Sequence, residues 1–215
     1  MSHLAILREK IPAEVFDDAD LHLVLRGLSP SAIYSALSRL LKQGSLLKVR
    51  RGLYVFSEKM RKGPLSLHAV AARLYSPSAV SFESALSFHG LIPEGVYAVT
   101  STCPQMKNKI YTTPLGEFTY RPVPEAAFRL GIESIRAKGG SFLMSNPIKA
   151  LFDLTYAKRR VYANLEEIQS DLRIDLPELQ RFAKEFSYLE LETLANAYRK
   201  KSCERLRVVL MRGLT

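Results

Sequence analysis

The segment that starts at Ser29 has the strongest helix pattern in the chain. Serine is a favoured N-cap residue, and Pro30 fits the first helical position, where a missing N–H costs nothing. Apolar residues then recur at the spacing that places them on one face of a helix. They are Ile33, Ala36, Leu37, Leu40 and Leu41, and Gly44 follows as a stop signal. The pattern predicts a helix that buries one face and exposes the other.

The opposite face of this predicted helix is small, polar and basic, and it carries no carboxylate. Its members are Ser31, Tyr34, Ser35, Ser38, Arg39 and Lys42. Short side chains at the start of a recognition helix let its backbone approach the major groove of DNA, and longer basic ones farther along reach phosphates. Arg39 also has the donors to read guanine. The face is therefore a candidate DNA-reading surface.

A hairpin is predicted directly after this helix. Residues 46–49 and 53–56 read as short strands, and the turn between them contains Gly52, which tolerates positive φ. Lys48, Arg50 and Arg51 lie on this hairpin and complete the predicted DNA-facing set. Two shorter helices are predicted on the N-terminal side of Ser29, over 2–10 and 17–26. Three helices followed by a hairpin are the order of a winged helix-turn-helix domain, which we place at residues 1–60.

The positive charge of the chain is concentrated in the same region. The whole sequence has 31 Lys and Arg against 21 Asp and Glu, a formal net charge of +10. Between residues 26 and 63, Glu58 is the one acidic residue, whereas the rest of the chain is nearly balanced. A surface that binds a polyanion concentrates charge in this way. The alternative is a winged helix that contacts protein and has a solvated basic face.

A second, larger domain is predicted over residues 64–215, after a linker rich in basic residues, Gly and Pro. Its pattern mixes short strands and helices up to about residue 155 and is helical from 164 onward. Strands are expected near 79–82, 97–102, 109–112, 117–121, 132–137 and 141–144, with helices near 65–74, 83–88, 145–155, 164–171, 175–186, 188–200 and 202–212. The predicted fold class is α+β: an N-terminal winged helix-turn-helix followed by a mixed α/β C-terminal domain with a helical tail.

Catalytic and metal-binding patterns are weak in this sequence. The four histidines are scattered, and two cysteines, Cys103 and Cys203, suffice neither for a disulfide framework nor for a structural zinc site. Nucleophile-elbow, phosphate-loop and zinc-protease motifs are missing. We therefore expect no catalytic residues, metal or cofactor. A metal-dependent DNA-processing enzyme that uses Glu83, Glu117 and Asp153 stays open as a less favoured alternative.

Two motifs resemble a known antitoxin family. The sequence GSLLKVRRGLY at 44–54 fits the pattern G-x-L-x-x-x-x-R-G-x-Y at the end of its winged helix, and SFESALSFHGL at 81–91 fits a later S-x-E-S-A-L-x-x-H-G-L stretch. This is the AbiE-type antitoxin family of type IV toxin–antitoxin systems, which are linked to abortive phage infection. The resemblance covers roughly residues 1–155 and is strongest over 29–56 and 79–122.

The resemblance implies a two-domain regulator. Its N-terminal domain would bind operator DNA, at inverted repeats, through the nine positions named above and would repress its own operon. Its C-terminal domain would counter a nucleotidyltransferase-like toxin without a stable complex. The two motifs do not identify the residues of this sequence that would serve the antitoxin function. Basic residues of the C-terminal part are candidates for that role or for extra DNA contact, although a solvated face is the more ordinary explanation: Lys158, Arg159, Arg160, Arg199, Lys200 and Lys201.

A regulator of this kind without any toxin is the alternative within the same class. We expect the protein to be cytoplasmic, without a membrane partner. No apolar run approaches the roughly 18 residues that a membrane span needs, and no basic region followed by an apolar stretch stands at the N-terminus.

Overall fold

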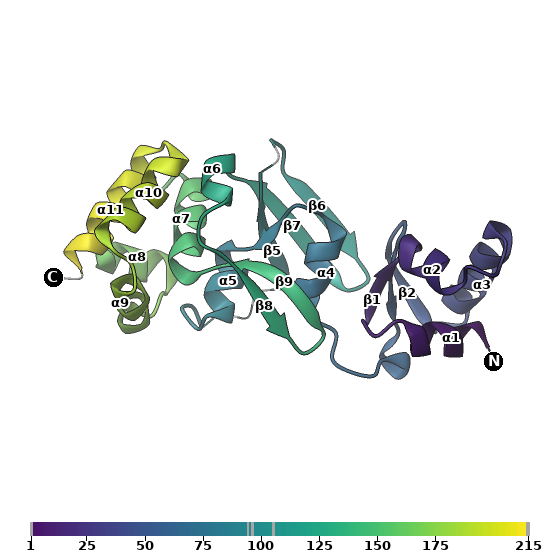
Figure 1. Cartoon of the computed structure of the whole chain (residues 1–215). Helices are drawn as coiled ribbons and strands as arrows, with labels where there is room; N and C mark the ends of the chain where they lie inside the picture. The colour runs from purple at the N-terminus through teal and green to yellow at the C-terminus, as the bar shows by residue number, and fades with distance from the viewer. Residues whose placement is uncertain (1, 94, 96, 105, 214–215) are drawn as a thin grey trace.

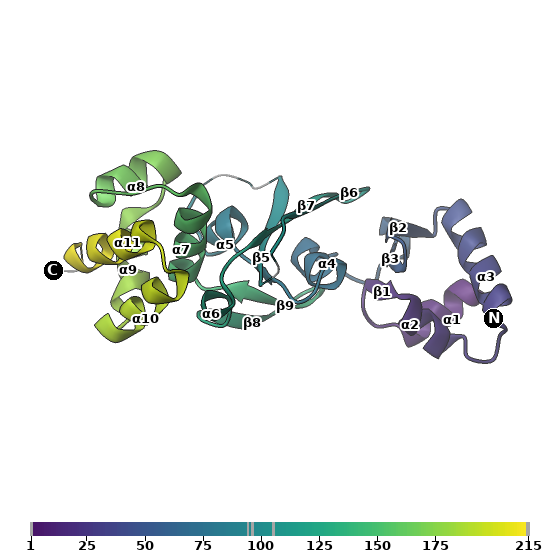
Figure 2. The same ribbon diagram turned by 90° about the horizontal axis from the view of Figure 1, so that it is seen from above.

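The computed structural model describes residues 2–93, 95, 97–104 and 106–213. The molecule is elongated, with the first three helices at one end and the C-terminal helices at the other (Figures 1 and 2). The predicted α+β class is confirmed: helices and strands are mixed along the chain, and the last third is helical.

The N-terminal part contains three α-helices and a small antiparallel sheet. Its elements are α1 (His3–Lys10), β1 (Val15–Asp17), α2 (Asp18–Val24), α3 (Pro30–Lys42), β2 (Leu46–Arg50), β3 (Leu53–Phe56) and the 3-10 turn η1 (Glu58–Met60). Strand β3 is central, because it pairs with both β1 and β2. Strand β1 was not predicted from the sequence.

Helix α3 forms as its sequence pattern predicts. The Ser29 hydroxyl accepts a hydrogen bond from the N–H of Ala32 and caps the helix, and Pro30 takes the first turn. The buried face consists of Ile33, Ala36, Leu37 and Leu40. Three of these residues pack in a core with apolar side chains from α1, α2 and one side of the sheet. The side chain at Leu41 is only partly buried against this core.

The other side of the small sheet joins the N-terminal part to the rest of the chain. Val15, Val49, Leu53 and Val55 belong to the same core cluster as the buried residues of α4 (Leu67–Leu74). The sheet is therefore covered on both sides, by the N-terminal helices on one and by the larger part on the other.

The larger part is built on a six-stranded mixed sheet. Its elements up to β9 are α4, β4 (Ala79–Val80), α5 (Phe82–Phe88), β5 (Ala98–Cys103), β6 (Lys109–Thr113), β7 (Gly116–Pro122), α6 (Glu125–Phe128), β8 (Ile132–Ala137) and β9 (Gly140–Ser145). The strand order is β6-β7-β5-β4-β9-β8, with β5–β7 and β4–β9 parallel. Helix α4 lies between this sheet and the N-terminal part (Figure 2).

Helix α7 (Pro147–Lys158) is the centre of the C-terminal half. It lies between the sheet and the remaining helices, which are α8 (Leu165–Leu172), α9 (Leu176–Lys184), α10 (Tyr188–Tyr198) and α11 (Lys201–Arg212). Its buried residues include Lys149 and Asp153, which form a fully buried ion pair. The Tyr198 hydroxyl donates a further hydrogen bond to the Asp153 carboxylate, at 2.7 Å. A charged pair thus occupies the middle of this core.

The sequence motif at 81–91 builds part of the same packing. The Ser81 hydroxyl donates to the Asp153 carboxylate at 2.6 Å. Ser84 and Thr100 form reciprocal bonds between side chain and backbone that fix α5 to β5. His89 ends α5, and its Nε2 lies 3.1 Å from the Ser145 carbonyl oxygen. Ser81, Ser84 and His89 of the motif therefore have structural partners in the sheet and in α7.

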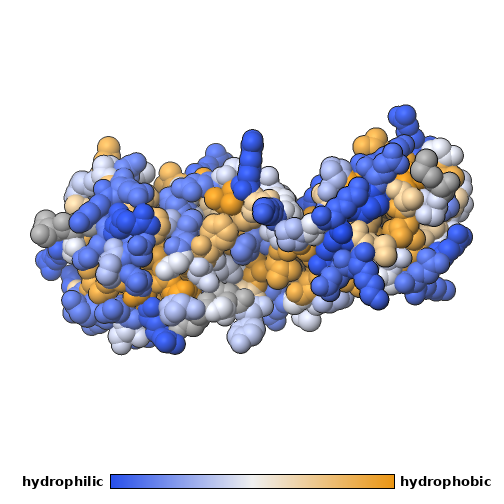
Figure 3. Space-filling model, turned by 90° about the horizontal axis from the view of Figure 1, so that it is seen from below, coloured by the Kyte–Doolittle hydropathy of each residue, from blue (hydrophilic) through white to orange (hydrophobic). Residues whose placement is uncertain are grey.

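None of the described helices is both long and apolar enough to cross a membrane. The face of the molecule in Figure 3 mixes hydrophilic and apolar side chains along its whole length.

Candidate nucleic-acid interface

The predicted reading face of α3 is exposed in the structure. All six of its predicted residues, Ser31, Tyr34, Ser35, Ser38, Arg39 and Lys42, have exposed side chains. The last five line one open, shallow hollow on the protein surface. Helix α3 lies at the end of the molecule farthest from the C-terminal helices, as both ribbon views show (Figures 1 and 2). The large sheet and its helices therefore leave this face free.

Tyr34 is held by a contact from the preceding helix. The rings of His22 and Tyr34 meet edge to face, with centroids 5.8 Å apart and an interplanar angle of 78°. Tyr34 nevertheless keeps 47% of its surface exposed. The contact fixes an aromatic side chain at the N-terminal half of α3, where recognition helices contact base edges.

The hairpin turn is fixed to the start of α2. The backbone N–H of Asp18 donates to the Gly52 carbonyl oxygen at 3.3 Å. Gly52 has a φ of +78°, and a Cβ at this position would lie 3.1 Å from the Asp18 Oδ2. Both the backbone angle and the close approach favour glycine. The turn that carries Arg50 and Arg51 is thus anchored, and a register shift between Lys48 and Arg50 adds a local irregularity to β2.

Asp18 also influences Tyr54, which lies opposite Lys48 in the hairpin. Burial raises the pKa of the Tyr54 hydroxyl, and the nearby charge and hydrogen bonding of Asp18 raise it further. The hydroxyl therefore stays protonated at neutral pH, when it can donate to this carboxylate. The pairing of Asp17 with Leu53 joins β3 to the residue that caps α2.

The hairpin residues lie nearer the larger part than the α3 residues do. The positive charge of Arg50 acts on Tyr120 of β7, where it opposes the rise in pKa that burial causes. Lys48, Arg50 and Arg51 all have exposed side chains. The nine predicted residues thus form two exposed groups, one on α3 and one on the hairpin.

Two basic residues of the charged segment have structural roles at the predicted linker. The Arg61 Nε donates to the Phe56 carbonyl oxygen at 2.9 Å. The backbone N–H of Lys62 donates to the buried Glu14 carboxylate, which also pairs with Arg8 at 3.0 Å. These bonds hold residues 61 and 62 against the N-terminal part, at the point where the chain continues into the larger part. Sequence reasoning missed the contact between Glu14 and Lys62, because these two residues lie 48 positions apart in the chain.

The three carboxylates of the metal-dependent alternative have different surroundings. Glu117 is exposed on β7, and Glu83 of α5 is half-buried beside another hollow. Asp153 is buried and bonded to Lys149, Ser81 and Tyr198. Within the described ranges, no three His, Cys, Asp or Glu residues group as potential metal ligands. Asp153 serves the packing of the core, so the structure gives this alternative no assembled site in the part of the chain that it describes.

The basic residues of the C-terminal part are only partly grouped. Arg159 and Lys200 line one hollow together with Arg121 of β7. Arg160 instead pairs with Asp171 at 3.0 Å. Lys158, Arg199 and Lys201 are exposed at the ends of α7, α10 and α11.

A helix with an exposed, basic, carboxylate-free face beside an antiparallel hairpin is typical of proteins that contact nucleic acid. Comparison with protein families found a match in this region. Residues 13–57, from β1 through β3, match the family described as "Transcriptional regulator, AbiEi antitoxin". The match confirms, over these residues, the predicted resemblance to the AbiE-type antitoxin family, whose members are transcriptional regulators and antitoxins of abortive infection systems.

The match contains α2, α3 and the hairpin and therefore all nine predicted DNA-facing residues. A comparison with curated proteins found no match.

Proposed function

We propose that this protein is a sequence-specific DNA-binding autorepressor and the antitoxin of a type IV system, acting in the cytoplasm against a nucleotidyltransferase-like toxin. In this proposal residues 1–60 are a winged helix-turn-helix domain, with α3 as recognition helix and the β2–β3 hairpin as wing. Residues 64–215 are the antitoxin-type domain. The operator is double-stranded DNA with inverted repeats, and the toxin is countered without a stable complex.

The observation that carries the proposal is the exposed face of α3. Its hollow is lined by two serines, one tyrosine and two cations, without a carboxylate. Small side chains allow close approach to the base edges, and Arg39 and Lys42 at the C-terminal end of the helix supply donors for guanine or phosphate. The match to a family of regulators over the same residues supports it.

The experiment measures binding to the DNA upstream of the protein's own gene. A duplex of that sequence should bind at least about a thousandfold more tightly than a scrambled duplex at physiological salt, because specific and non-specific affinities differ by this order. The same fragment should be repressed when it drives a reporter in cells. Equal affinity for both duplexes would contradict sequence-specific repression.

The antitoxin part needs a separate measurement. Co-expression with a neighbouring nucleotidyltransferase-like reading frame should restore growth, and a variant that no longer binds DNA should still do so. A stand-alone regulator is the second candidate, since the family match lies within 13–57 and bears on the N-terminal part. Repression without rescue of growth would favour that candidate.

A further inference from the structure

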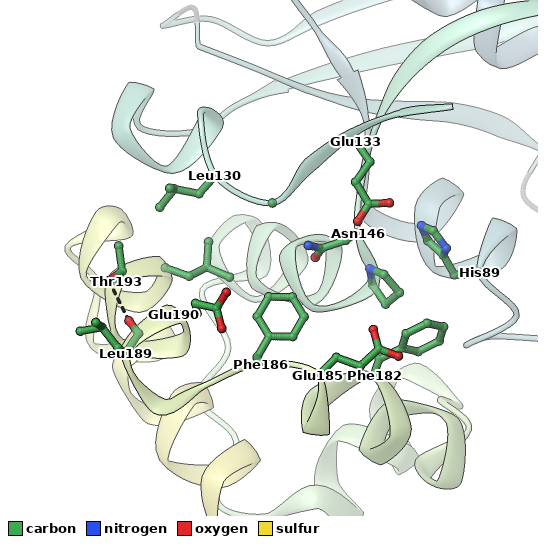
Figure 4. A pocket seen from close by; sticks show the side chains of 13 residues that line it. His89, Leu130, Glu133, Asn146, Phe182, Glu185, Phe186, Leu189, Glu190 and Thr193 are labelled. Carbon is green, nitrogen blue, oxygen red and sulfur yellow. Dashed lines mark hydrogen bonds between the residues drawn. The ribbon is translucent and has the colours of Figure 1, made fainter. Parts of the chain in front are cut away.

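A second feature lies at the opposite end of the molecule from α3. A pocket of about 670 Å³ opens between the N-terminal end of α7 and the helices α9 and α10 (Figure 4). Small-molecule binding sites usually have volumes of about 300 to 1,000 Å³. The pocket is remote from every residue of the proposed DNA interface, and it lies in the part proposed as the antitoxin-type domain, where no residue has yet been given a role.

The walls of the pocket are largely apolar. Its apolar lining residues are Leu130, Pro147, Phe182, Phe186, Leu189 and Leu194. Figure 4 shows the Phe186 ring facing the middle of the pocket. Leu189 is 68% exposed, although leucine is among the residues most often buried in folded proteins. These side chains offer an apolar and aromatic surface to a ligand.

The polar lining of the pocket is acidic, although the chain as a whole is strongly basic. Glu133, Glu185 and Glu190 line it, and no Lys or Arg does so among the described residues. The Glu190 carboxylate is already used, because it accepts hydrogen bonds from the Ser187 backbone and hydroxyl. The carboxylates of Glu133 and Glu185 have no ion pair or hydrogen bond with the described part of the chain. Two carboxylates therefore stand available beside an apolar surface.

His89 also lines the pocket, on the side of Glu133 (Figure 4). Its Nε2 lies 3.1 Å from the Ser145 carbonyl oxygen, an arrangement in which Nε2 carries the proton and donates. Burial lowers the pKa of His89, and the Ser145 carbonyl and the Glu133 charge oppose this shift. In the neutral ring the remaining nitrogen, Nδ1, is an acceptor. The acceptors of Glu133, Glu185 and His89 call for a ligand rich in donors.

Asn146 supplies a donor that complements such a ligand. Its side chain is only 9% exposed, and Figure 4 shows it directed into the pocket. Its Oδ1 accepts from the Lys149 N–H at 2.8 Å and so caps α7. That bond fixes the amide orientation and leaves Nδ2 without an acceptor in the described structure. The amide N–H groups are therefore free for a carbonyl oxygen of the ligand.

We infer that this pocket binds the arginine side chain of a peptide segment from a partner protein. A guanidinium is planar, stacks on aromatic rings and pairs with carboxylates through several N–H donors. The same region already shows this chemistry, because the Arg181 guanidinium lies 4.4 Å over the Phe182 ring. The peptide carbonyl accepts from Asn146, and the apolar stem and neighbouring side chain cover Phe186 and Leu189.

The test uses two peptides that differ only in charge. Binding of N-acetyl-arginyl-leucinamide and of its citrulline counterpart, a neutral urea analogue, is measured on the full chain by titration with two-dimensional NMR. The arginyl peptide should bind about tenfold more tightly, since hydrogen bonds to charged groups are worth roughly 1.5 kcal/mol or more. Its shifts should centre on Asn146, Phe186 and Leu189. Equal affinities for the two peptides would overturn the assignment.

Matched variants locate the effect. Glu133→Gln with Glu185→Gln should abolish the preference for arginine over citrulline, whereas Glu117→Gln with Glu166→Gln removes the same charge from exposed positions outside the pocket and should leave it unchanged. An unchanged preference in the first variant would contradict the site. Agmatine, a guanidine without a peptide carbonyl, should bind more weakly than the arginyl peptide. Equal binding of agmatine would overturn the assignment to a peptide segment.

Discussion

Arg73 of α4 donates a hydrogen bond to Asp20 in the first turn of α2, with 2.7 Å between Nη1 and Oδ2. The same Nη1 lies 3.9 Å from Asp17, the N-cap of α2. Because α4 packs on the large sheet, this ion pair bridges the N-terminal and C-terminal parts at the edge of their shared apolar contact. The helix pair α2–α3 is thereby oriented by contacts outside the N-terminal core.

The pKa of Asp20 predicts how this bridge responds to acid. Burial raises the pKa, but the hydrogen bond from Arg73 and then that from the Asp17 N–H lower it, and the net value lies below 3.8. A carboxyl with a lowered folded-state pKa contributes stability above its unfolded pKa and loses it as the pH falls through the folded value. Arg73→Gln should therefore cost about 0.5 kcal/mol at neutral pH, given the exposure of the pair.

The measurement is urea unfolding of wild type and Arg73→Gln from neutral pH into the acid range. The difference between the two should vanish once the pH lies well below 3.8. It should also shrink at high salt, since exposed pairs are screened. A difference that grows towards acid pH would contradict the assigned role of the bridge.

The buried Lys149–Asp153 pair predicts a large effect on stability. Burial lowers the pKa of Lys149, and its pairing with Asp153 opposes this. Lys149→Met should lower the free energy of unfolding by about 3 to 5 kcal/mol, because it leaves the carboxylate charge buried without its cation. The combined change Lys149→Met and Asp153→Leu should cost less than the sum of the two single changes.

Denaturant unfolding of these variants gives the comparison. Lys158→Met, an exposed position on the same helix, is the control and should change stability by no more than about 0.5 kcal/mol. An equally small loss of unfolding free energy in Lys149→Met and Lys158→Met would contradict the burial of the Lys149–Asp153 ion pair.

Gly52 at the hairpin turn should resist substitution more than Gly27 does. Alanine at Gly52 would take a φ of +78° and place its Cβ against the Asp18 carboxylate, whereas a Cβ at Gly27 would meet open space. Gly52→Ala should destabilise the protein by about 1 to 2 kcal/mol, and Gly27→Ala should be nearly neutral. Thermal unfolding of both variants checks this, and equal melting temperatures would count against the anchored turn.

The two arginines of the hairpin should contribute through phosphate contacts. Arg50→Ala with Arg51→Ala should weaken operator binding and reduce the slope of log K against log salt by about one to two, one for each lost phosphate contact. Gel-shift titration over a series of salt concentrations measures both quantities. The matched control is Arg136→Ala with Lys138→Ala, at exposed positions of the β8–β9 hairpin, and it should leave the slope unchanged. An unaltered slope in the Arg50 and Arg51 variant would exclude these residues from the interface.

The sequence predicted α3 well because its signals are local. Ser29, Pro30 and the spacing of Ile33 to Leu40 all act within a few turns of one helix. Strand β1 was missed since three residues, Val15–Asp17, have no periodicity of their own and become a strand only by pairing with β3. Elsewhere in the chain as well, the sequence predicts elements that local patterns determine and misses those that depend on contacts between distant residues.

Lys149 and Asp153 illustrate why the interior was harder to predict. A lysine and an aspartate four positions apart usually mark a solvent-exposed helix pair. Here they are buried by the elements around α7, among them α10, which brings Tyr198 from 45 residues away. The pocket beside α7 was missed for a similar reason, because its walls come from five separate segments.

The central claim is that the exposed face of α3 contacts DNA. Ser35→Glu with Ser38→Glu places two carboxylates on that face without altering its buried side, and Ser134→Glu with Ser170→Glu makes the same change at exposed positions elsewhere. Affinity for the upstream duplex should fall by at least about a hundredfold in the first variant, since each charge repels phosphate and blocks base edges. The control should lose less than about tenfold, an effect of net charge alone. Equal losses in the two variants, with both folded by circular dichroism, would contradict the claim.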